Sequence, residues 1–269
     1  MQQVGTPSNS KQETSLWATP RIITNLKNCD FYHTMDIPGF GVVKGHWDLR
    51  SGIRNYLGKV DVKGKHVLEI GTASGFACFY MEKQGAEVVA YDLSDKQAWD
   101  IVPYAGNNYS QKITDRKNHI KRLNNSFWLA HRAYKSQAKM VYGTVYDIPE
   151  NLGMFHITTF GCVLLHLRDP FLALQNAAQH TQDIIIITEP FFSPNTAPPL
   201  GNLFQTIFLP DSKTRWPEDG WWALSPHIIK RFIAVLGFEK TKTTFHIQNH
   251  FGKKKPLFTI VGYRTRKAA

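Results

Sequence analysis

A short run of small residues carries the clearest chemical signal in the sequence. The stretch Gly71–Gly75 reads Gly-Thr-Ala-Ser-Gly and follows the apolar run His66–Ile70, with a helical pattern after it. Small residues between a strand and a helix let a ligand approach the backbone and the helix N-terminus. Asp92 ends the next apolar run, roughly 20 residues further on, where a carboxylate can accept hydrogen bonds from ribose hydroxyls. This spacing predicts a nucleoside-like cofactor.

Two neighbouring residues narrow the identity of that cofactor. A dinucleotide site would need a third glycine where the sequence has Phe76, so that the helix packs closely and receives the pyrophosphate. Glu69 points toward the loop, where it would repel a diphosphate and attract a ligand that carries an ammonium and a sulfonium. S-adenosylmethionine is such a cofactor.

The pattern Glu69-x-Gly71-x-Ala73-x-Gly75 followed by Asp92 resembles motif I and the ribose-binding acid of class I S-adenosylmethionine-dependent methyltransferases. The family has glycine where this chain has Ala73. The resemblance extends over about residues 45–265, and it includes the subgroup of bacterial natural-product methyltransferases and that of tRNA wobble-uridine methyltransferases. It therefore does not choose the substrate.

Further matches support the resemblance and imply cofactor contacts. Tyr146–Pro149 stands where the family places an acid or its neighbour near the adenine, and the strand 155–161 would end beside the methionine moiety. The run 161–170 is similar to a V-L-x-H-L-x-D-P sequence common after that strand, and the run 45–50 also matches. The implied cofactor-binding residues are Trp47, Glu69, Gly71, Ala73, Gly75, Asp92, Leu93, Tyr146, Asp147 and Gly161.

Methyl transfer from a sulfonium mainly requires that the acceptor atom lie in line with the methyl carbon, roughly 3–3.5 Å away. An amine or hydroxyl acceptor can also need a base, and histidine suits this task because its pKa lies near physiological pH. His166 is the first candidate, with a helix-start histidine bonded to backbone as the alternative. Glu189, at the end of a predicted strand, is the second, with solvation or a salt bridge as the alternative.

Aromatic residues in the flanking segments are candidates for the acceptor pocket. We expect Tyr32, His46, Phe204, Trp221 and Trp222 to bind substrate, and ordinary packing is the alternative for each. Tryptophan-rich segments that cover the site would indicate a bulky apolar or aromatic acceptor.

Cys29, Cys78 and Cys162 form no CxxC pair, so we expect no metal site and reduced, buried thiols.

Alternating apolar runs and helical patterns predict an α/β fold, a Rossmann-like doubly wound and mostly parallel seven-stranded sheet with an antiparallel C-terminal hairpin. The expected strands are 66–70, 87–91, 139–142, 155–161, 184–188, 238–248 and 257–265, the last two joined by the loop 249–256. The expected helices are 75–84, 170–180 and one that begins after Ser225 and ends at Gly237.

The remaining segments predict a roof over the sheet. Residues 1–45 read as a disordered tail to about Ser15 and the start of an N-terminal lid that reaches Leu57; residues 46–269 form the methyltransferase domain. Segments 94–138 and 190–224 are expected to be insertions.

The net charge of +11 is divided unevenly along the chain. Basic residues gather in 111–140 and 230–269, whereas 61–110 and 141–229 are acidic. Such blocks suit nucleic acid, but no RNA-binding module is recognisable. We therefore expect a small-molecule acceptor methylated on nitrogen or oxygen, with tRNA as the alternative partner. The absence of a long apolar run or leader predicts a cytoplasmic protein with no membrane contact.

Overall fold

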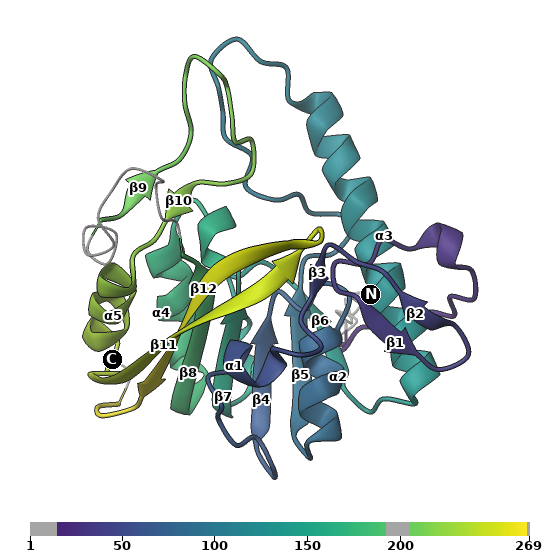
Figure 1. Ribbon diagram of the computed structural model, residues 1–269, viewed down its shortest axis with the longest axis horizontal. Coiled ribbons are helices and arrows are strands. Elements are labelled where there is room, and N and C mark those ends of the chain that lie inside the picture. Colours follow the sequence, from purple (N-terminus) through teal and green to yellow (C-terminus); the bar gives the residue numbers. More distant parts are fainter. Residues whose placement is uncertain (1–14, 192–204, 268–269) are drawn as a thin grey trace, which may run out of the picture.

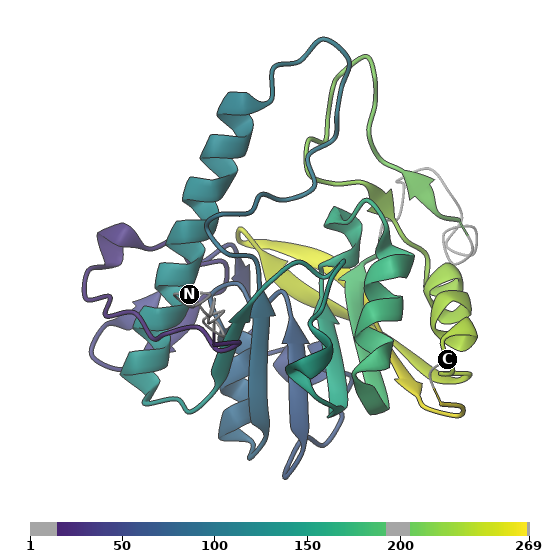
Figure 2. The same ribbon diagram turned by 180° about the vertical axis from the view of Figure 1, so that it is seen from behind.

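The computed structural model describes residues 15–191 and 205–267, and an eight-stranded sheet forms its centre (Figures 1 and 2). The strand order is β3-β11-β12-β8-β7-β4-β5-β6. The parallel strands are β4 (His66–Ile70), β5 (Glu87–Asp92), β6 (Lys139–Tyr142), β7 (Phe155–Gly161) and β8 (Thr181–Pro190). All five were predicted, because each is a short apolar run between turn residues.

Strand β4 has β5 on one side and β7 on the other. The chain leaves β4 toward β5 and β6 and then crosses back to add β7 and β8. The order of the strands therefore reverses beside β4. In open α/β sheets, ligands bind at such a switch point, outside the carboxyl ends of the strands.

The C-terminal hairpin confirms the predicted antiparallel pair, but its turn is shorter than expected. Strands β11 (Lys240–His250) and β12 (Lys253–Tyr263) leave only Phe251 and Gly252 between them. Both turn residues have positive φ, 48° and 76°, as a two-residue hairpin turn requires. The predicted loop 249–256 was too long. Three lysines and a proline, which are uncommon in strands, form the start of β12. The two-residue strand β3 (Trp47–Asp48) pairs with the end of β11 and is the eighth strand.

Helices cover both faces of the sheet. Helices α2 (Phe76–Lys83) and α3 (Ser110–Tyr134) pack on one face, and α4 (Pro170–Gln179) and α5 (Pro226–Val235) on the other. The predicted start of α5 is confirmed, since Ser225 Oγ accepts the Ile228 N–H at 3.2 Å and proline fills the first helical position.

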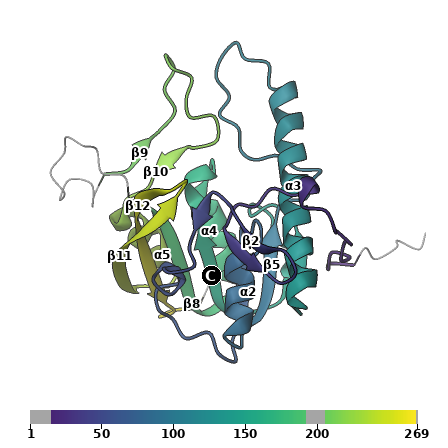
Figure 3. The same ribbon diagram turned by 45° about the vertical axis from the view of Figure 1, so that its right-hand side comes forward.

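Much of the predicted insertion 94–138 is the crossover helix itself. The C-terminal half of α3 buries Phe127, Trp128 and Ala130 against the sheet. Its N-terminal half rises above the sheet edge, beside the loop before it (Figure 3). Ion pairs join this half to the loop between β9 (Ile207–Phe208) and β10 (Trp222–Ala223). Of the segment 94–138, the N-terminal half of α3 and the loop before it are therefore the part that lies beyond the sheet.

The N-terminal segment, residues 15–57, packs on the same face as α2 and α3. Its residues Met35, Ile37 and Leu49 are almost fully buried. The smaller elements are η1 (Leu26–Asn28), β1 (Met35–Ile37), β2 (Gly41–Val43), α1 (Ile53–Tyr56), η2 (Glu150–Leu152), η3 (Leu164–His166), β9 (Ile207–Phe208) and β10 (Trp222–Ala223). Within the described ranges, no helix is both long and apolar enough to span a membrane.

Candidate active site

The loop after β4 turns tightly because its residues are small. Gly71, Ala73 and Gly75 have φ values of 76°, 49° and 86°, a region that L side chains rarely adopt. A Cβ on Gly71 would lie 2.5 Å from a methyl of Val163, and one on Gly75 would lie 2.5 Å from the Phe79 ring. The predicted need for small residues therefore has a steric reason at both glycines.

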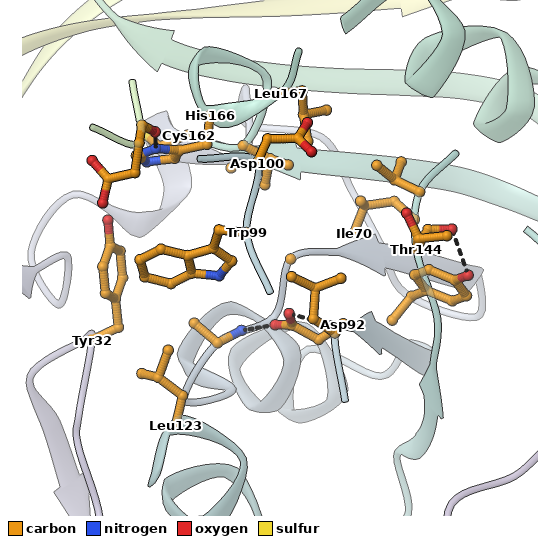
Figure 4. A pocket seen from close by; sticks show the side chains of 18 of the residues that line it. Tyr32, Ile70, Asp92, Trp99, Asp100, Leu123, Thr144, Cys162, His166 and Leu167 are labelled. Atoms are coloured by element: carbon orange, nitrogen blue, oxygen red, sulfur yellow. Dashed lines mark hydrogen bonds between the residues drawn. The ribbon is translucent and has the colours of Figure 1, made fainter. Parts of the chain in front are cut away.

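A cavity of about 340 Å³ lies above this loop, at the carboxyl ends of β4, β5 and β7 (Figure 4). Its volume is in the range of small-molecule sites. The predicted residues that line it are Tyr32, His46, Gly71, Ala73, Asp92, Leu93, Tyr146, Gly161 and His166. Among the residues the sequence did not single out are His33, Trp99, Asp100, Arg116, His119, Gly143, Thr144 and Asp219.

Asp92 is the half-buried carboxylate on the cavity floor. Its Oδ2 accepts the Ala73 N–H and its Oδ1 accepts the Leu93 N–H, each at 2.7 Å. Burial raises the pKa of this carboxyl, while the two N–H groups oppose that rise. Each oxygen has a second lone pair, so the residue can still accept hydrogen bonds from a ligand.

Of the two neighbouring residues predicted near the adenine, Tyr146 lines the cavity and Asp147 does not. The Tyr146 hydroxyl lies in the cavity wall, where it donates to the Asp100 carboxylate and accepts the Asp169 N–H at 3.2 Å. Asp147 does not line the cavity. Its backbone carbonyl accepts the Tyr91 hydroxyl at 3.4 Å, and Thr144 with its neighbours takes its place in the wall.

Glu69 lies below the main cavity and is only 6% exposed. Thr72 Oγ1 donates to its Oε2 at 2.6 Å. Burial raises the pKa of Glu69 to about 7, and the neighbouring Asp92 charge adds to the rise. The side chain faces a smaller cavity of about 20 Å³, shared with His33 and Tyr56.

His166 is the predicted base that the structure does place in the cavity. Its Nδ1 lies 2.5 Å from the backbone carbonyl oxygen of Asp219. A carbonyl oxygen only accepts, so Nδ1 carries the proton and Nε2 of the neutral ring keeps its lone pair. Trp99 stacks nearly parallel to the imidazole, at a centroid distance of 6.2 Å. The tautomer suits a general base.

Glu189 is not positioned to contact an acceptor, contrary to the prediction. It is 2% exposed and does not line the cavity. Its Oε1 accepts the Leu164 N–H at 2.8 Å, at the start of η3, the turn that ends in His166. Burial raises its pKa to about 8 against the effect of these backbone donors. Strand β8 places Glu189 beneath the η3 turn. The carboxylate is therefore neither solvated nor paired with an arginine, which were the two predicted alternatives.

Three predicted tryptophans pack outside the cavity. Trp47 stacks on His250 at a centroid distance of 4.3 Å, because β3 joins the sheet edge there. Trp221 donates its indole N–H to the Asp100 carbonyl at 2.9 Å, and Trp222 donates to the Arg168 carbonyl at 3.3 Å. All three therefore pack against other parts of the chain, whereas Trp47 was expected to contact the cofactor and the other two the acceptor. Gly75, too, shapes the loop without lining the cavity, and Phe204 lies outside the described residues.

A polar cluster above the cavity was missed by the sequence-based prediction. Arg116 of α3 makes an ion pair with Asp219 at 2.7 Å, and its guanidinium lies 4.9 Å from the Trp99 ring centroid. His119, one helical turn after Arg116, packs its ring edge-on to Trp99. Residues spaced i, i+3 lie on the same face of a helix, so the spacing of Arg116 and His119 could have indicated that they act together. The prediction overlooked this pair because the helix contains many other charged residues.

Three basic residues of α3 make ion pairs within the molecule. Lys112 pairs with Glu218, and Arg122 pairs with Asp30 at 2.8 Å, in addition to the Arg116–Asp219 pair. The acidic partners come from the N-terminal segment and from the loop between β9 and β10. This part of the positive charge therefore closes the roof of the cavity.

All three cysteines are free and buried, as predicted. Burial raises the pKa of the Cys162 thiol far above neutral, which makes it a poor nucleophile. In the described ranges, no group of three or more His, Cys, Asp or Glu side chains is arranged to hold a metal ion.

The sequence matches no protein-family model and no curated protein. Its fold does match solved structures, among them one named as an S-adenosylmethionine-dependent methyltransferase and one crystallised with SAH. The N-terminal domain of EvdMO1, crystallised in the presence of SAH and D-fucose, superposes with a TM-score of 0.51 at 14% identity, over 90% of this chain and 93% of that one. The S-adenosylmethionine-dependent methyltransferase SibL, in its apo form, gives 0.50 at 10% identity, over 81% of this chain and 56% of that one. The chain thus has the class I methyltransferase fold.

Proposed function

We propose that this protein is an S-adenosylmethionine-dependent methyltransferase that acts on a small molecule. One observation carries the proposal. The cavity lies at the switch point of the sheet, and its floor combines the tight loop 71–75 with the half-buried carboxylate of Asp92. The similarity to solved methyltransferase structures in fold supports the same cofactor.

The floor gives each end of the cofactor a different environment. The ribose hydroxyls would donate to the free lone pairs of Asp92, with Leu93 and Thr144 beside the base. The sulfonium would lie near Gly71 and Gly161, which line the cavity with backbone atoms. Glu69, at that end, would attract the ammonium of the amino-acid group.

The acceptor would occupy the side of the cavity below the roof, close to His166. When bound, the cofactor supplies an activated methyl group. The protein must then orient the acceptor, exclude water and remove a proton where the acceptor is a hydroxyl or an ammonium. Nε2 of His166 is the candidate base, held by the bond from Nδ1 to the Asp219 carbonyl.

The acceptor side is more polar than the sequence indicated. Tyr32, His46, Arg116, His119 and Asp219 line it, while Trp221 and Trp222 do not. We therefore propose an acceptor that carries polar groups as well as a ring or apolar framework, methylated on oxygen or nitrogen. The alternative of a tRNA acceptor loses support, because three cations of the basic helix pair with acids of this chain.

Isothermal titration calorimetry with SAH tests the cofactor assignment directly. Wild-type protein should bind, and Asp92→Ala should weaken the affinity more than tenfold, about 1.4 kcal/mol. Asp95→Ala is the matched control, because Asp95 pairs with Arg21 at 3.4 Å and does not line the cavity. Equal affinities for wild type and the folded Asp92 variant would contradict the assignment.

A methyl-transfer assay separates the two classes of acceptor. Radiolabelled S-adenosylmethionine would be incubated with a panel of hydroxylated and amino ring compounds and, in parallel, with total tRNA. We expect label in the small compounds. Label in tRNA that falls steeply with rising salt would instead support the RNA alternative.

A further inference from the structure

His33 is a buried histidine that takes no part in the catalysis proposed above. It belongs to the N-terminal segment and is 8% exposed. Its Nδ1 is, in residues 15–191 and 205–267, the one buried side-chain nitrogen or oxygen that has no hydrogen-bond partner. Buried polar atoms are normally paired, so an unpaired one at a cavity wall calls for a ligand or a structural explanation.

The position of His33 is fixed by the residues around it. Its backbone N–H donates to Ser74 Oγ, in the loop after β4, at 3.1 Å. Gly45 packs against its backbone so closely that a Cβ there would lie 2.4 Å from the His33 carbonyl carbon. The imidazole packs near the Phe76 ring, at a centroid distance of 5.9 Å. The ring is thus held against the predicted cofactor loop.

Two cavities meet at this imidazole. His33 lines the main cavity and also the smaller one of about 20 Å³, whose other walls include Glu69, Gly71 and Gly161. A space of that size holds one water-sized group. His33, which has an unpaired imidazole nitrogen, and Glu69, which has a carboxylate, therefore line a space that a single small donor group would fill.

We propose that this small cavity receives the ammonium group at the amino-acid end of bound S-adenosylmethionine, with His33 Nδ1 and the Glu69 carboxylate as its hydrogen-bond acceptors. The inference rests on the proposed function and extends it to a residue outside the sheet and its loops. Burial lowers the pKa of His33 to about 3, so the ring is neutral and Nδ1 can accept once the proton is on Nε2. The N-terminal segment would then bind the amino-acid end of the cofactor through His33.

Two ligands that differ only at that end give the test. SAH carries the amino-acid group, whereas 5′-methylthioadenosine has the same nucleoside and sulfur without it. By calorimetry, His33→Leu should weaken SAH binding about tenfold and leave 5′-methylthioadenosine within twofold of wild type. His33→Asn, which keeps an acceptor, should restore part of the SAH affinity. His66→Leu, at the opposite end of β4, is the control.

Each remaining outcome decides against the inference. An equal loss for both ligands would show that His33 only supports the loop, and no loss for either would show that water fills the small cavity. Circular dichroism identifies a variant that fails to fold, and His33→Asn then carries the comparison. If wild type binds neither ligand, the proposed function itself is wrong, which differs from a selective failure of His33.

Discussion

The floor and the roof of the cavity are built in different ways. The floor consists of the loop 71–75 with Asp92 and Leu93, and its residues are close in sequence to two adjacent strands. The roof consists of His46, Trp99, Arg116, His119 and Asp219, which come from three separate segments. The floor is held by backbone geometry, whereas the roof is held by side-chain pairs such as Arg116–Asp219. The floor would serve the cofactor that the fold shares, and the roof the acceptor that differs between proteins.

The largest effect in this comparison is expected from removal of the candidate base, His166. If the roof side holds the acceptor, His166→Ala should lower turnover by about 10²–10⁴, the usual contribution of general base catalysis. Cofactor affinity should stay within twofold, because the floor is unchanged. Steady-state kinetics with an acceptor found in the panel, together with calorimetry with SAH, measure both quantities. Undiminished turnover would show that the reaction needs no base at this position.

Glu69, directly below the floor, should make the stability of the protein depend on pH. Because burial raises the pKa of Glu69 from 4.5 to about 7, the folded protein binds a proton there more tightly than the unfolded chain. This contribution to stability is present below about pH 4.5 and is lost as the pH rises to about 7. Glu69→Gln should remove this pH-dependent change in the free energy of unfolding, which is about 3 kcal/mol by linkage. Urea denaturation of the ligand-free protein between pH 4.5 and 7.5 measures the slope.

The same carboxylate should make cofactor binding depend on pH with the opposite sign. An ammonium pairs with the ionised form of Glu69, so SAH affinity should rise severalfold from pH 5.5 to 7.5 in wild type. In Glu69→Gln the affinity should be flat across that range. A parallel rise in both proteins would assign the dependence to another group.

Within the roof, the Arg116–Asp219 pair should affect the acceptor more than the cofactor. Arg116→Ala removes the pair and the cation above Trp99, so we expect the KM for acceptor to rise about five- to tenfold while the SAH affinity changes less than twofold. A double-mutant cycle with Asp219→Ala isolates the pair, because the Asp219 carbonyl that holds His166 remains in that variant. Additive effects would mean that the two side chains act independently.

The sequence predicted the floor far better than the roof, for a physical reason. Gly71, Ala73 and Asp92 were identified because strand, turn and strand follow one another in the chain, so spacing determines position. Trp99 and Asp219 are far apart in the sequence, and only the fold brings them together. The prediction for Trp221 and Trp222 was wrong, since an indole N–H can be satisfied by a backbone carbonyl behind the cavity as well as by a ligand.

Glu189 shows the same limit within the sheet. The end of a parallel strand was correctly placed near the site, yet the backbone N–H donors at the η3 turn made the carboxylate a cap for that turn. A strand end predicts where a side chain starts. It does not predict which polar group the side chain satisfies.

The smallest expected effect concerns the lysines of the two basic blocks. Lys253, Lys254 and Lys255 are exposed on the hairpin, and Lys117 and Lys121 belong to α3 without lining the cavity. If the acceptor is a small molecule held under the roof, replacing all five with alanine should change kcat/KM less than twofold and leave its salt dependence unchanged. If the acceptor is RNA, removing each lysine that neutralises a phosphate should weaken binding and reduce the slope of affinity against salt by about one. Measuring kcat/KM at about 50 and 200 mM salt for the wild-type and substituted proteins therefore decides whether the positive charge serves the reaction or only the fold.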